Sequence, residues 1–186
     1  MNKFLQKLVN EMVRNGELGG YVHDTAMSQY IPPTLFHFAP ATMSMAAGQV
    51  TDTIAEHRAA NNETTLVSIP IWIPSNSAYA KGAYLKSIEV DYEVLTAQPT
   101  SIGAVVNLIT RGADTAVATV AVQAQTGVPN SSGRITVDQH KLVCTITTPF
   151  WLLNTQYVIL QLTFTCGVTG TVEDFLGAVA NFTQRM

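Results

Sequence analysis

Hydrophobic and polar residues alternate with a period of two along most of the chain after residue 63, as half-buried β-strands do. The alternating runs are TTLVSIPIWI, YLKSIEVDYEVL, SIGAVVNLIT, TAVATVAVQA, HKLVCTITT, TQYVILQLTFTC and TVEDFLGAVANFT. Segments such as PSNSAYAKGA and TGVPNSSG separate them and have the composition of turns. Seven or eight short strands with no helix between them predict an all-β fold, an antiparallel sandwich over residues 64–186. A jelly roll is the commonest arrangement of eight such strands in two sheets.

Residues 1–15 predict a helix, because apolar residues recur there at a spacing of four. Phe4, Leu8 and Met12 form one narrow stripe, and Gly16 is a natural helix stop. An isolated helix of about 15 residues is only marginally stable in water. We therefore expect this N-terminal helix to lie on its own domain, on other copies of the chain or on a different protein.

The segment 17–63 has no sustained helical period and is interrupted by glycine and proline pairs. It nevertheless carries more apolar residues than a disordered linker does. We expect an extended arm that is ordered by packing along a larger surface, and the sequence allows one strand within 49–58. The chain is thus expected to consist of a helix and docking arm, residues 1–63, followed by the β-sandwich.

Charged residues make up only 12 % of the chain, while hydrophobic residues make up 47 %. The charged share is about half of the ~25 % that is typical of globular domains. A chain that buries much of its surface against partners tolerates so little charge. The net charge is −3 and the ten basic residues are scattered, which argues against nucleic acid or a membrane surface as the partner. Charge throughout the first 20 residues also differs from a signal peptide.

The two cysteines, Cys144 and Cys166, are too few for a disulfide framework. The pattern favours two small core thiols in a protein made in a reducing cytoplasm, and a single bridge between them is the alternative. His140 and Cys144 share one side of a strand but lie about 13 Å apart by strand rise, too far for a nucleophile and its base. The four histidines show no metal-ligand spacing, so we expect no metal and no cofactor.

The run IEVDYEV places three carboxylates, Glu89, Asp91 and Glu93, on one face of a strand. Neighbouring members of this acidic row are about 6.6 to 6.8 Å apart by strand rise. The string EVDYE is similar to the E-x-D-x-E signature of the jelly-roll β-glucanases of the laminarinase and lichenase type. That resemblance implies that Glu89 is the nucleophile, Glu93 the acid/base and Asp91 a helper, because the reaction needs one attacking carboxylate and one proton donor.

Two features of the sequence weigh against a glycosidase. Such an enzyme needs a sugar-binding cleft floored by aromatic side chains, whereas the two tryptophans, Trp72 and Trp151, lie inside apolar segments. The β-region also leaves little sequence for cleft-forming loops. We therefore interpret the acidic row as the solvated face of an ordinary strand, where charge prevents edge pairing, and expect no enzymatic activity.

The β-region resembles structural proteins of tailed bacteriophages, namely jelly-roll capsid decoration (cement) proteins and head-fibre-like or tail-associated β-domains. The segments that carry the resemblance are IPIWIPSNSAYAKGAYLKSIEVDYEV, RGADTAVATVAV and TQYVILQLTFTCGVTGTVEDFLGAVANFT. It implies a non-enzymatic virion protein, made in the host cytoplasm, that attaches to the phage head and stabilises it. In such proteins the sandwich is often a trimer, held on the shell by an N-terminal arm.

Under this hypothesis the partners are other copies of the chain, as a homotrimer, and the major capsid protein or another virion protein. The apolar residues of the helix and arm would make these contacts: Phe4, Leu8, Met12, Tyr30, Leu35, Phe36 and Phe38. Two alternatives remain. One is a carbohydrate- or host-binding sandwich, as on a tail fibre, with its site in the loops 74–82 or 125–134. The other is the glycosidase that uses Glu89 and Glu93.

Overall fold

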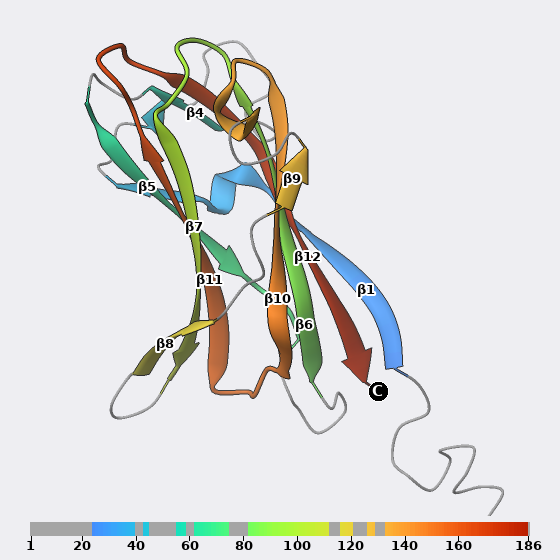
Figure 1. Cartoon of the computed structure of the whole chain (residues 1–186). Coiled ribbons are helices and arrows are strands. Elements are labelled where there is room, and N and C mark those ends of the chain that lie inside the picture. The colour runs from blue at the N-terminus through green and yellow to red at the C-terminus, as the bar shows by residue number, and fades with distance from the viewer. Residues whose placement is uncertain are drawn as a thin grey trace, which may run out of the picture.

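The computed structural model describes residues 24–39, 43–44, 55–58, 62–74, 82–111, 116–120, 126–128 and 133–185. Two antiparallel sheets pack face to face in this part of the chain (Figure 1). Sheet A contains β3 (Met43–Ser44), β4 (Ala55–Arg58), β12 (Val172–Arg185), β6 (Ala83–Val94), β10 (Gln139–Trp151) and β9 (Thr126–Val128), in that order, with β1 (Asp24–Ile31) also on β12. Sheet B contains β2 (His37–Ala39), β5 (Thr64–Ile71), β11 (Gln156–Thr165), β7 (Ser101–Thr110) and β8 (Ala116–Val120), in that order. The predicted β-sandwich is confirmed.

The strand pairing is that of a jelly roll. The outermost strands pair with each other, β4 with β12, and the inner ones follow as nested pairs: β5 with β11, β6 with β10 and β7 with β8. This is the pattern of one long hairpin rolled into two layers. Rolling it brings β6 beside β12 and β7 beside β11, which completes the two sheets.

The core lies between the sheets and follows the alternation of the sequence. On β6 the side chains of Ile88, Val90 and Tyr92 are fully buried, while the residues between them face outward. Strand β11 repeats the pattern with Val158, Leu160, Leu162 and Phe164 inside. Because the side-chain period of a strand is two, each buried row fixes which residues reach the opposite, outer face.

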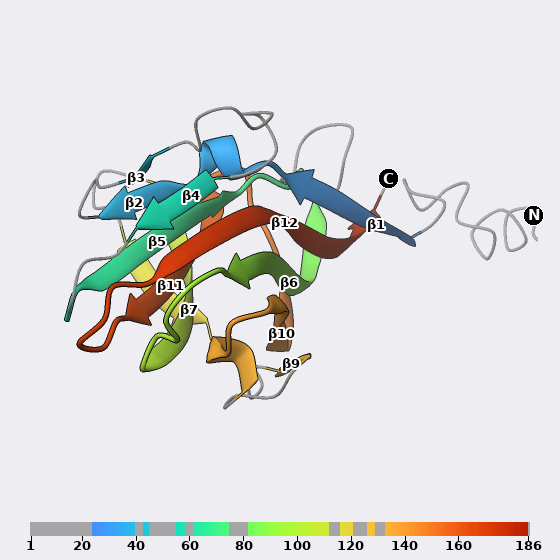
Figure 2. The ribbon, with the colours of Figure 1, turned by 90° about the horizontal axis from the view of Figure 1, so that it is seen from above.

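The strand pairing extends the sandwich upstream of residue 64. Strand β1 lies along β12 (Figure 2), and Tyr30 donates a hydrogen bond of 2.8 Å to the backbone carbonyl of Leu176. Strand β12 is long, and β4 pairs with its first residues only, up to Phe175. The remaining edge would expose unpaired N–H and C=O groups, and β1 covers them. Part of the surface expected for the arm is therefore the chain's own sheet.

The residues expected to dock this arm fall into three groups. Phe36 is 4 % exposed and packs in the core, and Phe38 packs against it from β2. Tyr30 and Leu35 are 56 % and 44 % exposed and remain accessible. Phe4, Leu8 and Met12, with the helix expected over 1–15, lie outside the described residues.

Sheet B carries no Asp, Glu, Lys or Arg in any of its five strands. Sheet A has charged residues on β6, β10 and β12, among others. The low charge of the chain is therefore unevenly placed, and the outer face of sheet B is built from neutral side chains. No helix in the described part of the chain is long and apolar enough to cross a membrane.

Both cysteines are free and buried, which confirms the interpretation as core thiols. Burial raises the pKa of the Cys144 thiol from 9.0 to about 11, against a smaller lowering by the charge of Arg134. The unfolded chain therefore loses this proton near pH 9, while the folded chain keeps it until about pH 11. Fewer protons are then bound by the unfolded state, so its population rises with pH.

We expect this thiol to cost the protein about 2–3 kcal/mol of stability between pH 9 and pH 11. Urea unfolding of the wild type and of Cys144→Ala at pH 8, 9, 10 and 11 measures it. The variant should lose less stability over this range than the wild type does. Equal losses in the two proteins would show that other groups, such as the buried Tyr92 with its raised pKa, account for the whole effect.

Candidate functional site

The acidic row lies on the outer face of sheet A, where one lysine lies close to two of its three carboxylates. Lys141 Nζ on β10 is 3.1 Å from Glu89 Oε2 and 3.7 Å from Asp91 Oδ1. The hydrogen bond that Lys141 donates to Glu89, followed by the charge of Asp91, raises the pKa of Lys141 above its usual value. The carboxylates thus occupy the solvated strand face that the alternation predicts.

A polar network continues from the acidic row across the sheet. Asn181 Nδ2 donates to Glu89 Oε1 at 2.8 Å, and Ser28 Oγ donates to Asn181 Oδ1 at 2.6 Å. Four neighbouring strands, β1, β12, β6 and β10, are joined in this way. The carboxylate row therefore has ready structural partners, and none of its members lines the cavity described next.

Because the ion pairs of Lys141 with Glu89 and Asp91 are partly exposed to solvent, removing one charge should have a small effect. We expect Glu89→Gln to change the free energy of unfolding by less than about 1 kcal/mol. Urea denaturation at low and at 1 M salt measures it, and the difference from the wild type should shrink at high salt. A loss of several kcal/mol would mean that the row is a structural element of the core.

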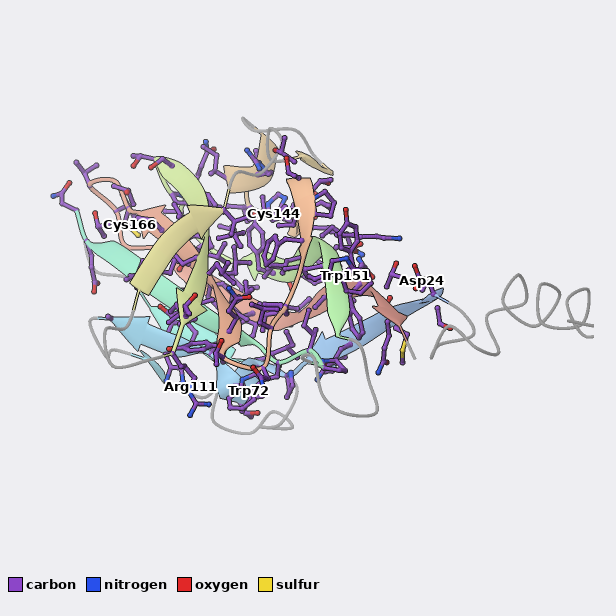
Figure 3. The ribbon with its side chains drawn as sticks, turned by 90° about the horizontal axis from the view of Figure 1, so that it is seen from below. Asp24, Trp72, Arg111, Cys144, Trp151 and Cys166 are labelled. Carbon is purple, nitrogen blue, oxygen red and sulfur yellow. The ribbon has the colours of Figure 1, made fainter. Side chains whose placement is uncertain are left out.

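A cavity of about 410 Å³ opens at one end of sheet B. It is formed by the ends of β5 and β7 and by the connection between β10 and β11, which lies at the bottom of Figure 1. Its lining consists of Pro70, Ile71, Trp72, Ile73, Arg111, Leu152, Asn154, Gln156, Tyr157 and Val158. Figure 3 shows Trp72 and Arg111 next to each other at this end of the molecule. The volume is within the range of small-molecule sites, about 300–1,000 Å³.

Trp72 is 67 % exposed, although its sequence context is apolar. The pairing of Ile71 with Val158 is the last of the β5–β11 ladder. Successive side chains along a strand point to opposite faces, so the residue after the buried Ile71 points outward. Pro74 follows and has no backbone N–H with which to extend the ladder. The expectation that the tryptophans leave the chain without an accessible aromatic surface is therefore wrong for Trp72.

Tyr157 is the second aromatic residue of the cavity and is 39 % exposed. If the register of the ladder is continued by one residue, Tyr157 lies opposite Trp72. An indole ring just after β5 and a phenol ring on the adjacent β11 supply two apolar faces with polar tips at the solvent boundary.

Arg111 follows the last residue of β7 and is held in place by its backbone. Its N–H donates to the carbonyl oxygen of Thr155 at 2.7 Å, while its side chain is exposed. The guanidinium group forms no ion pair with any residue that the structure describes. It is the one cation among the described lining residues, and no carboxylate stands beside it there.

The two amides of the lining play different parts. Gln156 accepts a hydrogen bond from the backbone N–H of Leu153 at 3.1 Å and donates to Thr110 Oγ1 at 3.4 Å. It therefore fixes the β10–β11 connection and has little capacity left for a ligand. Asn154 is exposed at the tip of this connection, where its amide can both donate and accept.

This arrangement suits a polar ring compound with an apolar face. A flat aromatic ring can cover the C–H face of a pyranose, while amide, phenol and guanidinium groups meet its hydroxyls. Among the residues that the structure describes, no three His, Cys, Asp or Glu side chains gather as metal ligands. The described lining residues offer binding groups, and no nucleophile paired with a base is among them.

Sequence reasoning placed a binding site in the loops 74–82 or 125–134, most of which lie outside the described residues. The cavity adjoins the first of these loops at Ile73 but is built mainly from strand ends. One signal was available, since the alternation that buries Ile71 predicts an outward indole at Trp72. The sequence carried no such signal for Arg111 and Tyr157, because their place in the cavity depends on which strands are neighbours in the sheet.

The solved structures to which the chain is similar include distant likenesses from a phage and a plant. No protein-family model and no curated protein matches the sequence. A tailspike protein 4 domain of bacteriophage CBA120 aligns at TM-score 0.31 and 4 % identity over 86 % of this chain, which spans 19 % of that protein's length. A Lotus tetragonolobus seed lectin aligns at TM-score 0.38 and 11 % identity, over 86 % of this chain and 98 % of the lectin. At such scores the functional inference rests on the cavity itself.

Proposed function

We propose that this chain is a non-enzymatic, glycan-binding β-sandwich that attaches to a carbohydrate surface, such as that of a host cell, through the cavity at the end of sheet B. The observation that carries the proposal is the exposed indole of Trp72 inside this cavity, beside Tyr157 and beside Arg111, which has no ion-pair partner among the described residues.

The exposure of Trp72 is informative because it is costly. Leaving a large apolar side chain in water forgoes roughly 1.5–3 kcal/mol of burial free energy. Single exposed apolar residues are common, but a tryptophan in a hollow with free polar groups marks a binding site. A sugar ring stacked on the indole would recover part of this free energy, since it removes apolar surface from water on both sides.

Binding of the purified chain to an array of immobilised bacterial and plant glycans tests the proposal. We expect Trp72→Ala to weaken binding by roughly 2 kcal/mol or more, a factor of about 30 in Kd. Trp72→Phe should retain part of the affinity, because a smaller aromatic face remains. Glu89→Gln, on the opposite sheet, is the control and should bind as the wild type does. The proposal fails if no glycan binds, or if Trp72→Ala binds as tightly as the wild type.

A structural role in a phage virion is the second candidate, and the uncharged sheet B favours it. A face without Asp, Glu, Lys or Arg on its strands is suited to be covered by a second copy of the chain. Val105 on β7 and Val117 on β8 are 43 % and 63 % exposed on this sheet. Assembly through this face and glycan binding at its end are compatible, as in an attachment protein.

We expect the full chain to be an oligomer, and Val105→Lys to dissociate it, because a buried unpaired charge is costly. Light scattering coupled to size exclusion at several concentrations measures the mass. Thr147→Lys adds the same charge to an exposed position of β10, on the other sheet, and should leave the mass unchanged. A wild type that stays monomeric at high concentration contradicts the structural candidate and leaves glycan binding to be judged separately.

A further inference from the structure

Resting on the proposed function, we infer that the glycan bound at this cavity is acidic, and that Arg111 recognises the carboxylate of a uronic acid or a similar sugar acid. The aromatic residues of the cavity would accept neutral and acidic sugars alike, whereas Arg111 distinguishes them by charge.

The electrostatics of the lining carry this inference. Arg111 is the cation of the cavity, and none of the described lining residues is acidic. The whole chain has a net charge of −3, so a cation at this cavity does not reflect general basicity. By contrast, Lys141 is held between Glu89 and Asp91 on the other sheet. A cation that has no acidic neighbour among the described lining residues can pair with an anionic ligand.

The position of Arg111 suits the binding of a carboxylate in a defined geometry rather than a general attraction of anions. Its backbone is anchored to Thr155, so the side chain starts from a fixed point at the cavity rim. A guanidinium group is planar and can donate two parallel hydrogen bonds to one carboxylate. Trp72 and Tyr157 line the same cavity and would hold the sugar ring while Arg111 meets its acid group.

With one cation among the described lining residues, the cavity also favours one kind of anion. A sugar carboxylate carries one negative charge, which one guanidinium group can neutralise. A phosphate monoester carries about −1.5 to −2 at neutral pH and is usually met by several cations or backbone N–H groups. A monoanionic carboxylate is thus the matching ligand for the described lining.

The experiment compares acidic oligosaccharides with their own methyl esters. The probes are galacturonate, glucuronate and mannuronate oligosaccharides, each with its fully methyl-esterified form, which keeps the ring but removes the charge. Calorimetric titration is run with the wild type, Arg111→Gln, Arg111→Lys and Trp72→Ala. We expect the wild type to bind at least one acid about ten- to a hundredfold more tightly than its ester, as a charge-assisted hydrogen bond in a cavity allows.

Arg111→Gln should lose this preference while still binding the ester, and Arg111→Lys should keep part of it. Trp72→Ala should lose both the acid and the ester. If the wild type binds esters or neutral glycans as tightly as acids, or if Arg111→Gln keeps the preference, the inference is overturned while the proposed function stands. If neither acids, esters nor neutral glycans bind, the proposed function falls and the inference falls with it.

Discussion

Replacing Phe175 with alanine is expected to lower the free energy of unfolding by about 3–5 kcal/mol, the usual cost of deleting a fully buried phenyl ring. Phe175 on β12 is fully buried and lies at the centre of an aromatic cluster. Its ring centroid is 5.4 Å from that of Phe164 on β11, and the planes meet at 88°. It is also 5.4 Å from Phe38, 6.0 Å from Phe36 and 6.4 Å from Tyr92.

The Phe175 cluster joins parts of the chain that are far apart in sequence. Phe175 and Tyr92 come from sheet A, whereas Phe164 and Phe38 come from sheet B. Alanine would therefore leave a cavity between the sheets and loosen the aromatic residues of the arm. Urea denaturation measures the loss, with Val168→Ala as the control, since Val168 is 81 % exposed. A loss below about 1 kcal/mol for Phe175→Ala would contradict this packing.

Gly177→Ala is expected to cost about 2–4 kcal/mol, from backbone strain and the disturbance of a neighbouring ring. Gly177 lies at an irregularity in the β12–β6 register and has φ +136°, which L residues rarely adopt. An added Cβ would also lie 2.5 Å from Cε2 of Tyr30. Moving that ring would break its hydrogen bond to the carbonyl of Leu176, which helps to hold β1 on β12.

A double-mutant cycle separates strain from clash at Gly177. In the background of Tyr30→Ala the clash is absent, so Gly177→Ala should cost only the backbone strain, about 1–3 kcal/mol. Chemical denaturation of the four proteins gives the coupling. A Gly177→Ala variant within about 0.5 kcal/mol of the wild type would show that neither the φ angle nor the Tyr30 contact constrains this position.

The sequence allowed much of the sandwich to be predicted, because the two-residue period is a local signal. Strands β6 and β11 begin and end within a few residues of their alternating runs, and their buried rows are those expected. Strand β1 gave no such signal, since nearly all of its side chains are exposed and it has no apolar row. It forms because β12 leaves an edge uncovered, which is a property of distant residues.

The candidate site was harder to predict for the same reason. An apolar context suggested that Trp72 is covered, but coverage depends on where the β5–β11 ladder stops, at Ile71. The meeting of Arg111 with Tyr157 depends on the β7–β11 register, which a single sequence does not reveal. Phe36 and Phe38 were expected to contact other copies of the chain or another virion protein, whereas in the fold they pack against the chain's own Phe175.

The most direct test of the central claim is the fluorescence of Trp72 during a glycan titration. The chain has two tryptophans, and Trp151→Phe removes the one that packs beside Tyr84, at a ring distance of 5.0 Å. The remaining indole reports on the cavity alone. We predict a saturable blue shift of its emission and reduced quenching by acrylamide as an acidic oligosaccharide binds. An emission spectrum and a quenching constant that stay unchanged while calorimetry records binding would place the glycan elsewhere and contradict the account.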